Sequence, residues 1–142
     1  MQMSRYLLLL VAIAVAVRAN AQAGPGWDLQ VPSHIEVPTG SAATLPIAII
    51  VESGKTVSKD ADITLDLAPE PGISIKRRRL RRADSIDPNG ESPRFAVPFT
   101  AARPGDYAVK VHIQFWVCGT KICRPIDARR TVAVSVTTPS RP

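Results

Sequence analysis

The chain has 142 residues, of which 45% are hydrophobic and 21% charged, with a formal net charge of +6. This length suffices for one domain with one hydrophobic core and is too short for two. The positive charge is local, because residues 76–82 contain six basic side chains, which argues against a general coating for nucleic acid.

Residues 1–23 have the features of a cleavable export signal. Arg5 precedes an apolar run from Leu7 to Val17, and residues 19–23 offer two overlapping Ala-x-Ala cleavage sites. The run is much shorter than the ~20 apolar residues that a membrane span needs. We therefore expect an exported mature chain without a transmembrane segment, with the periplasm as the first expectation and full secretion as the alternative.

The rest of the chain divides into short segments separated by Pro and Gly, with no helical period. Strands are predicted at 27–31, 35–37, 43–51, 63–67 and 95–99, and at 73–75 continuing into the basic stretch. Pro46 indicates that the strand at 43–51 lies at a sheet edge or begins late. Residues 52–60 are predicted to form a polar loop, and residues 87–90 (Asp-Pro-Asn-Gly) a turn.

The clearest predicted strand follows Pro104 and Gly105. Apolar residues occupy alternate positions from Tyr107 to Val117, and the opposite face carries Lys110, His112, Gln114 and Trp116. Tyr107 resembles the tyrosine that fixes a corner of a β-sandwich. A valine-rich strand follows at 132–136.

Seven or eight short strands at this spacing predict an all-β, antiparallel immunoglobulin-like β-sandwich, with a small barrel as the alternative. The predicted organisation is a signal peptide at 1–23, the sandwich domain at 24–137 and a flexible tail at 138–142.

Cys118 and Cys123 are the two cysteines, and four residues separate them. If the flanking strands form a hairpin, the cysteines face each other with Cα atoms about 4.5–5.5 Å apart. This range lies within the roughly 4.4–6.8 Å that disulfides need, and pairing is the default in an oxidising compartment. Strand parity predicts both sulfur atoms on the face opposite the core, although Pro125 interrupts the count for Cys123.

Three interpretations of this cysteine pair remain open. A bridge across so short a loop stabilises the fold by only ~2 kcal/mol, so a simple hairpin staple is one interpretation. An exposed disulfide is also accessible to an attacking thiolate, which favours redox exchange with a partner. Metal binding or an unpaired state is the third.

Residues 105–125, which end in Phe-Trp-Val-Cys-Gly-Thr-Lys-Ile-Cys-Arg-Pro, precede the valine-rich strand. This stretch resembles the N-terminal periplasmic domain of DsbD-type transmembrane disulfide reductases, with motif-level similarity over about the last forty residues. The resemblance implies an immunoglobulin-like sandwich in which Cys118 and Cys123 form the exchanging pair, bordered by Trp116 and Lys121. One cysteine would attack or receive a partner's disulfide and the other would resolve it. The implied partner is another exported or membrane thiol–disulfide protein.

The basic stretch is the second unusual feature. It supplies the candidate anion-binding residues Lys76, Arg77, Arg78, Arg79, Arg81 and Arg82. One interpretation is a surface for lipid head groups, polyanionic glycans or an acidic protein; another is a site for proteases that cleave after basic residues. The third is a solvated edge strand in which apolar residues point inward and the charges prevent edge pairing. Nearby acidic residues would partly neutralise it: Asp84, Asp87 and Glu91.

No cofactor or metal is expected. His112 shares a face with Cys118 but lies six residues away, about 20 Å along an extended strand, and His34 is not placed by any pattern. No hydrolase triad, paired-carboxylate motif or phosphate-binding loop is present in the sequence. The sequence therefore predicts an exported domain that takes part in thiol–disulfide exchange. The alternative is a structural or interaction module with a stapling disulfide and a basic binding surface.

Overall fold

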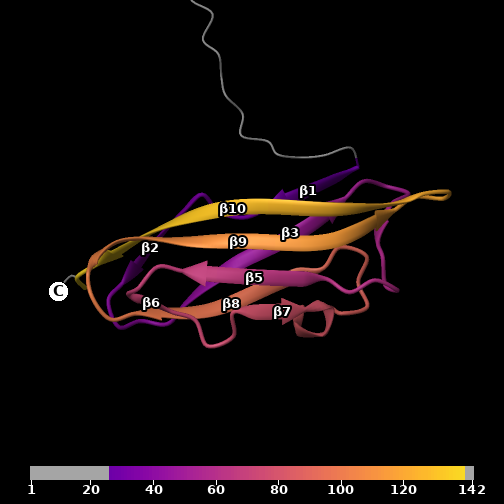
Figure 1. Cartoon of the computed structure of the whole chain (residues 1–142). Coiled ribbons are helices and arrows are strands. Elements are labelled where there is room, and N and C mark those ends of the chain that lie inside the picture. The colour runs from indigo at the N-terminus through magenta and orange to yellow at the C-terminus, as the bar shows by residue number, and fades with distance from the viewer. Residues whose placement is uncertain (1–25, 140–142) are drawn as a thin grey trace, which may run out of the picture.

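Alternating buried and exposed side chains sort the strands into two facing β-sheets. The computed structural model describes residues 26–139, so the predicted signal at 1–23 and the end of the predicted tail lie outside the described residues. The strands, labelled in Figure 1, are β1 (Trp27–Gln30), β2 (His34–Pro38), β3 (Ala43–Val51), β4 (Thr56–Val57), β5 (Thr64–Pro69), β6 (Ile73–Ser74), β7 (Arg79–Arg81), β8 (Arg94–Ala101), β9 (Gly105–Cys118) and β10 (Cys123–Thr137). A short 3₁₀-helix, η1 (Arg82–Asp84), follows β7.

The strand order matches the immunoglobulin-like arrangement. One sheet has the order β1-β3-β8-β6, and the other has β2-β10-β9-β5-β7, with β4 paired to β9 beside β5. These orders contain the ABED and CFG layers of a constant-type immunoglobulin sandwich, so the predicted fold class is confirmed. Residues 26–139 form ten strands rather than the expected seven or eight, because short strands such as β4, β6 and β7 add to the two sheets. The described strand pairs are antiparallel, as expected, with the exception of β2, which runs parallel to β10. After β1 the chain crosses at Pro32 to the opposite sheet and continues there beside β10.

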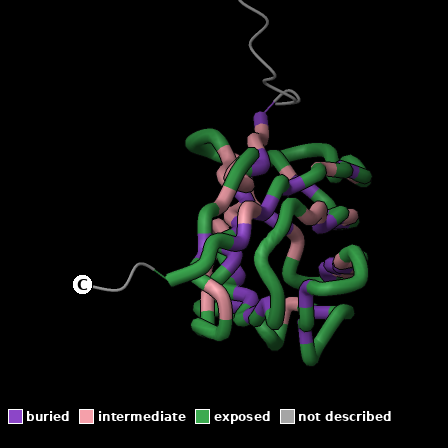
Figure 2. The backbone as a smooth tube through the Cα atoms, turned by 90° about the vertical axis from the view of Figure 1, so that its left-hand side faces the viewer, coloured by how far each residue is buried: buried purple, intermediate pink, exposed green. Residues whose placement is uncertain are grey.

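The core lies between the two sheets and consists of aliphatic and aromatic side chains from alternate strand positions. Figure 2 shows this alternation along the backbone as buried stretches (purple) between exposed ones (green). Its largest fully buried members include Phe95, Phe115, Leu45, Ile47 and Ile49. Trp27 packs edge-to-face on Phe115, with ring centroids 5.7 Å apart. Each such side chain contributes about 1.5–3 kcal/mol of hydrophobic stabilisation, which makes this cluster the main source of stability.

Two expectations about individual segments are corrected, and a third holds only locally. The segment at 52–60 is not entirely loop, because it contains β4, whose Val57 is fully buried. The stretch after Ile73 is not one strand: β6 pairs with β8 and β7 pairs with β5, so they belong to different sheets. Pro46 lies in β3, a strand with neighbours on both sides, but β1 pairs with β3 only from Ala48 onward. At Pro46 itself β3 is therefore locally an edge, which is where a strand tolerates proline.

The β9–β10 hairpin positions the cysteines. Its register is continuous from Gly105 opposite Val136 to Cys118 opposite Cys123. The tip of this hairpin projects beyond the ends of the other strands (Figure 1). The predicted turn near this end of the fold is also present, with the amide of Gly90 donating to the carbonyl of Asp87 at 3.1 Å.

Candidate functional site

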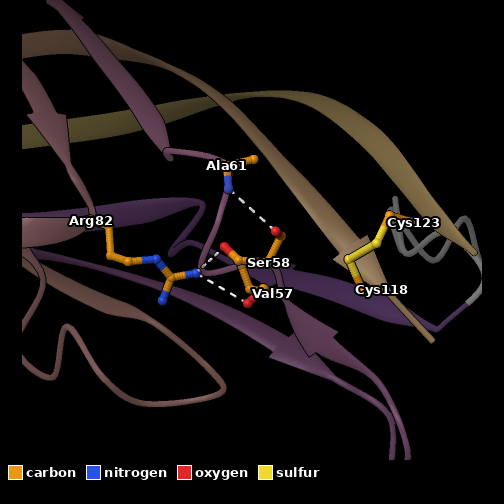
Figure 3. The surroundings of a disulfide bond; sticks show 6 residues. All are labelled: Val57, Ser58, Ala61, Arg82, Cys118 and Cys123. Carbon is orange, nitrogen blue, oxygen red and sulfur yellow. Dashed lines mark hydrogen bonds between the residues drawn. A yellow bond between two sulfur atoms is a disulfide. The ribbon is translucent and has the colours of Figure 1, made fainter. Parts of the chain in front are cut away.

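A disulfide joins Cys118 and Cys123 at the tip of the β9–β10 hairpin, as the sequence predicts (Figure 3). The two residues are directly opposite in the antiparallel register, as expected, but their Cα atoms are 4.0 Å apart, closer than the expected range of about 4.5–5.5 Å. The loop between them is closed by a hydrogen bond of 2.9 Å from the amide of Gly119 to the carbonyl of Ile122.

The sulfur atoms lie on the outer face of the six-stranded sheet. Pro125 does not shift the register, since it pairs with Trp116 and is followed by Asp127 opposite Gln114. The residues that share parity with Cys118 on β9 alternate with the buried core residues. Cys123 is exposed, whereas Cys118 is partly covered. The predicted placement on the face opposite the core is therefore confirmed.

The two cysteines differ in their neighbours across the sheet. Cys118 has strands on both sides, because Thr56 of β4 pairs with it opposite Cys123. On the side of β10 away from β9, no strand in residues 26–139 pairs with it between Cys123 and Val132, since β2 begins its pairing at Ala133. Cys123 thus stands at an open sheet edge and Cys118 in the interior of the sheet.

Arg82 holds β4 in place beside Cys118 (Figure 3). Its Nη2 donates to the carbonyls of Val57 at 3.1 Å and Ser58 at 2.5 Å, and its Nη1 donates to the carbonyl of Pro88 at 3.3 Å. Partial burial lowers the pKa of the guanidinium, an effect that the nearby Asp62 opposes. Sequence reasoning missed this role, because the contacts with Val57 and Ser58 span more than twenty residues and no local pattern encodes them.

Trp116 and Lys121, the predicted border residues, are both exposed near the disulfide. Trp116 keeps 41% of its surface exposed on the sulfur-bearing face, and Ile122 in the loop keeps 59%. These apolar surfaces beside an accessible disulfide are suited to contact with another protein.

A cleft of about 470 Å³ lies under the hairpin tip. It is lined by Lys55, Val117, Gly119, Thr120, Lys121, Ile122, Arg124 and Ile126. The lining contains three basic side chains and no carboxylate, and the apolar residues Val117, Ile122 and Ile126 also belong to it. We refer to it below as the tip cleft.

Farther along the outer face, Asp127 bridges two side chains of β9. His112 Nε2 lies 2.8 Å from one carboxylate oxygen, and Gln114 Nε2 donates to the other at 3.0 Å. The hydrogen bond from Gln114, and to a smaller extent the one from His112, lowers the pKa of Asp127.

His34 lies elsewhere, 2.8 Å from Ser135 Oγ, which in turn lies 3.1 Å from Asp106. The serine stands between the histidine and the aspartate, so this chain of contacts lacks the order of a hydrolase triad. Within residues 26–139, no group of three or more His, Cys, Asp or Glu side chains is arranged to hold a metal ion.

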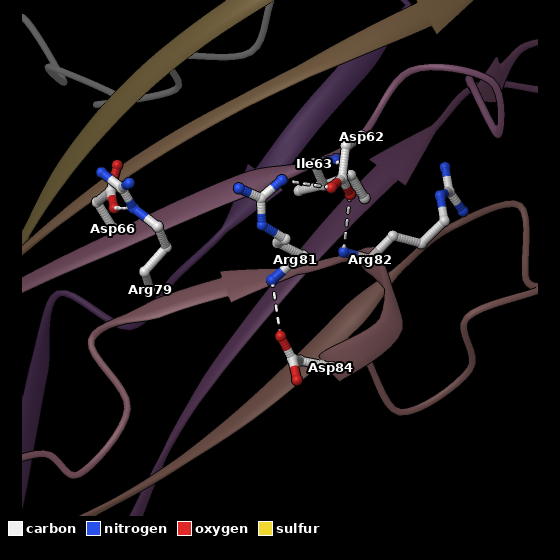
Figure 4. A network of polar contacts seen from close by, with 7 residues as sticks. All are labelled: Asp62, Ile63, Asp66, Arg79, Arg81, Arg82 and Asp84. Atoms are coloured by element: carbon white, nitrogen blue, oxygen red, sulfur yellow. Dashed lines mark hydrogen bonds and ion pairs between the residues drawn. The ribbon is translucent and has the colours of Figure 1, made fainter.

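The basic stretch is largely engaged in ion pairs (Figure 4). Arg79 Nε lies 2.7 Å from Asp66, Arg81 Nη1 lies 2.8 Å from Asp62, and Arg77 pairs with Asp84. Asp84 was among the predicted neutralising residues, whereas Asp62 and Asp66 come from the neighbouring β5 region and were missed.

The predicted inward residues of this stretch are buried: Ile73, Ile75 and Leu80. Strands β6 and β7 are each the last strand of their sheet. This arrangement matches the solvated-edge interpretation. Arg82 is turned to its structural contacts, so Lys76 and Arg78 are the exposed cations of the stretch for which the described structure gives no partner.

No family model matches this sequence, and neither does any curated protein. A similar solved structure is that of AggA, the major subunit of aggregative adherence fimbriae type I from Escherichia coli, with 10% identity, a TM-score of 0.44 and coverage of 78% of this chain and 94% of that one. The PapD-like domain 7 of human CEP192 has 10% identity and a TM-score of 0.44, with 99% of each chain covered. The CooA pilin subunit from enterotoxigenic Escherichia coli has 13% identity, a TM-score of 0.40 and coverage of 82% and 100%. At these values the likeness gives no information about function.

Within residues 26–139, no helix has the length and apolar character of a membrane span.

Proposed function

We propose that this chain is an exported protein, similar to the N-terminal domain of DsbD-type reductases, that exchanges electrons through the Cys118–Cys123 disulfide. The observation that carries the proposal is the position of the bond at a projecting hairpin tip, with Cys123 exposed at an open sheet edge. Such a bond is open to attack by a partner's thiolate, whereas a disulfide sealed between the sheets is not. The chain acts in this scheme as a redox partner for another exported or membrane thiol–disulfide protein.

The two sulfur atoms have unequal roles in the proposed exchange. A partner thiolate attacks Cys123 Sγ and forms a mixed disulfide, and Cys118 departs as a thiolate. The opposite order is disfavoured because Thr56 occupies the strand position beside Cys118. A second thiolate of the partner then attacks the partner's own sulfur in the mixed disulfide, which releases Cys123. The partner is oxidised to a disulfide and loses two electrons, and this chain gains them; the reverse reaction follows the same steps.

Local charge supports this chemistry. Lys55, Lys121 and Arg124 line the tip cleft beside the loop that joins the two cysteines, without a carboxylate among them. Cations near a cysteine stabilise its thiolate. A stabilised thiolate favours the reduced form of the pair and makes the disulfide easier to reduce.

A redox titration tests the proposal. The oxidised protein is equilibrated with glutathione or dithiothreitol buffers, and the dithiol fraction is measured by mass spectrometry after alkylation. An equilibrium potential near about −200 mV supports exchange. A potential below about −300 mV identifies an inert hairpin staple, and the chain is then a structural or interaction module.

A further inference from the structure

The backbone of β10 has outward-facing hydrogen-bonding groups beside the disulfide that find no backbone partner within residues 26–139. The amide of Ala133 donates to the carbonyl of Ser33 at 3.0 Å, so the backbone groups of Ala133 point away from β9. On β9, the carbonyl of Trp116 accepts from Ser58 at 2.8 Å, away from β10. Since the register is continuous, every second residue of β10 back to Cys123 shares the outward direction of Ala133.

The usable edge runs from Cys123 to Asp127. Three residues point their backbone groups outward along it. Cys123 and Asp127 each present an amide and a carbonyl, and Pro125 presents a carbonyl. Pro125 has no amide hydrogen but its carbonyl still accepts. From Arg129 onward, β10 lines a groove together with Asp28 of β1 and with Pro32, which follows that strand. The free edge is thus long enough for a short extended segment to pair by strand addition.

The positive charges on the core-facing side of this edge favour acidic side chains in a strand that pairs with it. Arg124 is exposed on β10 with parity opposite to Cys123, and it lines the tip cleft together with Lys55 and Lys121. In an added strand, alternate side chains point to opposite faces. A side chain beside Arg124 therefore faces the tip cleft, and its sequence neighbour faces the sulfur-bearing side.

We propose that the redox partner presents an extended acid–Cys–acid segment that pairs with the open edge of β10 at Cys123. Its acidic side chains lie over Arg124 and Lys121 at the tip cleft, and its cysteine lies opposite Cys123 on the outer face. Directly opposed strand residues have Cα atoms about 4.5–5.5 Å apart, which is within the range for a disulfide. The incoming sulfur, Cys123 and Cys118 then lie in a row across three neighbouring strands. This is the in-line arrangement that displacement of Cys118 by a thiolate requires. The inference rests on the proposed function, because it names the partner chemistry for the same disulfide.

Peptide binding tests the docking site separately from the redox step. Two nine-residue probes carry Val and Thr around a central Glu-Ser-Glu or Lys-Ser-Lys, in which Ser replaces the reacting Cys. Each is titrated into the ¹⁵N-labelled oxidised protein at low salt. The acidic probe is expected to bind more tightly and to shift the amide signals of Cys123, Arg124 and Asp127. Replacement of Arg124 by Ser is expected to weaken its binding by about threefold, as for loss of one exposed ion pair. Arg103→Ser, at an exposed position on a different loop, is the matched control and should leave binding unchanged.

The same peptides with Cys in the centre test the exchange. Their rates of mixed-disulfide formation are divided by their rates with a small aromatic disulfide, which corrects for the different thiol pKa of each peptide. The acidic peptide is expected to show the higher corrected rate, and Arg124→Ser to reduce that preference. Equal binding of both Ser probes, or signal shifts confined to residues 76–82, overturns the docking site. Docking at the edge without any mixed disulfide supports the docking site and overturns the redox function.

Discussion

The hydroxyl of Tyr107 donates a hydrogen bond of 3.0 Å to the carbonyl of Arg103, four residues earlier, and so fixes the corner where β9 begins. The sequence predicted this role from the Pro-Gly-Asp residues before the tyrosine. The corner lies at the opposite end of β9 from the disulfide, so it sets the starting point of the hairpin register that ends at Cys118.

Removal of this hydroxyl in Tyr107→Phe is expected to lower the free energy of unfolding by about 1 kcal/mol, the usual contribution of one hydrogen bond. Urea denaturation measures the change. The redox potential should stay the same, because the disulfide is at the far end of the strand. An unchanged unfolding midpoint contradicts a stabilising role for the corner.

Gly72→Ala is expected to destabilise the fold more strongly. An added Cβ would lie 2.3 Å from Tyr107 Cε1, and the backbone φ of +113° already disfavours a side chain. Gly40→Ala is the matched control, because its φ is +77° but nothing lies within 4 Å of the added atom. The difference between the two variants in urea denaturation reports the cost of displacing the tyrosine ring. Equal losses indicate that only the backbone conformation matters.

The unequal surroundings of the two cysteines predict unequal reactivity. In Cys118→Ala the remaining Cys123 is exposed at the open edge, and in Cys123→Ala the remaining Cys118 is partly covered beside Thr56. Cys123 is expected to react at least about threefold faster with an aromatic disulfide reagent, because access limits attack. Stopped-flow absorbance measures both rates, and the same variants in guanidinium, where access is equal, provide the reference. A faster Cys118 contradicts the proposed order of attack.

Arg82 is expected to be the most important basic residue of the stretch for stability. In Arg82→Met the carbonyls of Val57 and Ser58 lose charged donors, which costs about 1.5–3 kcal/mol. Loosening of β4 should also expose Cys118 and speed its reduction. Arg78→Met is the matched control, since Arg78 is exposed and its expected effect on the unfolding free energy is below about 0.5 kcal/mol. Equal urea midpoints for the two variants would refute the anchoring role.

The ion pair of Asp62 makes the free energy of unfolding depend on pH in the acidic range. Its hydrogen bond with Arg81 lowers its pKa, with partial opposition from burial. Because the folded-state pKa lies below the unfolded value of about 3.9, the contribution is present above that value and lost as the pH falls through the folded pKa. The stability difference between the wild type and Asp62→Asn should therefore be constant above pH ~5 and shrink below pH ~4. Urea denaturation of both proteins between about pH 6 and pH 2 measures this difference in unfolding free energy across the titration range of Asp62. A difference that grows as the pH falls contradicts the ion pair.

Anion binding by the basic stretch stays a prediction, and the ion pairs now specify which residues would carry it. The double variant Lys76→Ser with Arg78→Ser is expected to lose about 1 kcal/mol of vesicle affinity per residue removed. Arg79→Ser with Arg81→Ser should lose less, because these side chains are already paired with Asp66 and Asp62. Sedimentation with phosphatidylserine vesicles at several salt concentrations measures both. Equal losses imply that the ion pairs do not shield the arginines.

The sequence by itself determined the features that depend on strand alternation. The period of two along residues 107–117 assigned each side chain of β9 to a face, and it placed Cys118 on the outer face. The four-residue spacing to Cys123 set the hairpin and its bridge. These properties follow from local backbone geometry, which short-range sequence patterns encode directly.

Only the tertiary structure decided what surrounds the cysteines. Three contacts around the cysteines join segments that are far apart in the chain. Thr56 pairs with Cys118, and Arg82 contacts Val57. Strand β2 pairs with β10 only from Ala133 onward and so leaves Cys123 at an open edge. Strand β4 has two residues, too few to produce a period, and the acidic partners of Arg79 and Arg81 come from the neighbouring β5 region. Such contacts result from the packing of the whole sandwich, in which each long-range neighbour is fixed by the sheet order rather than by the residues beside it.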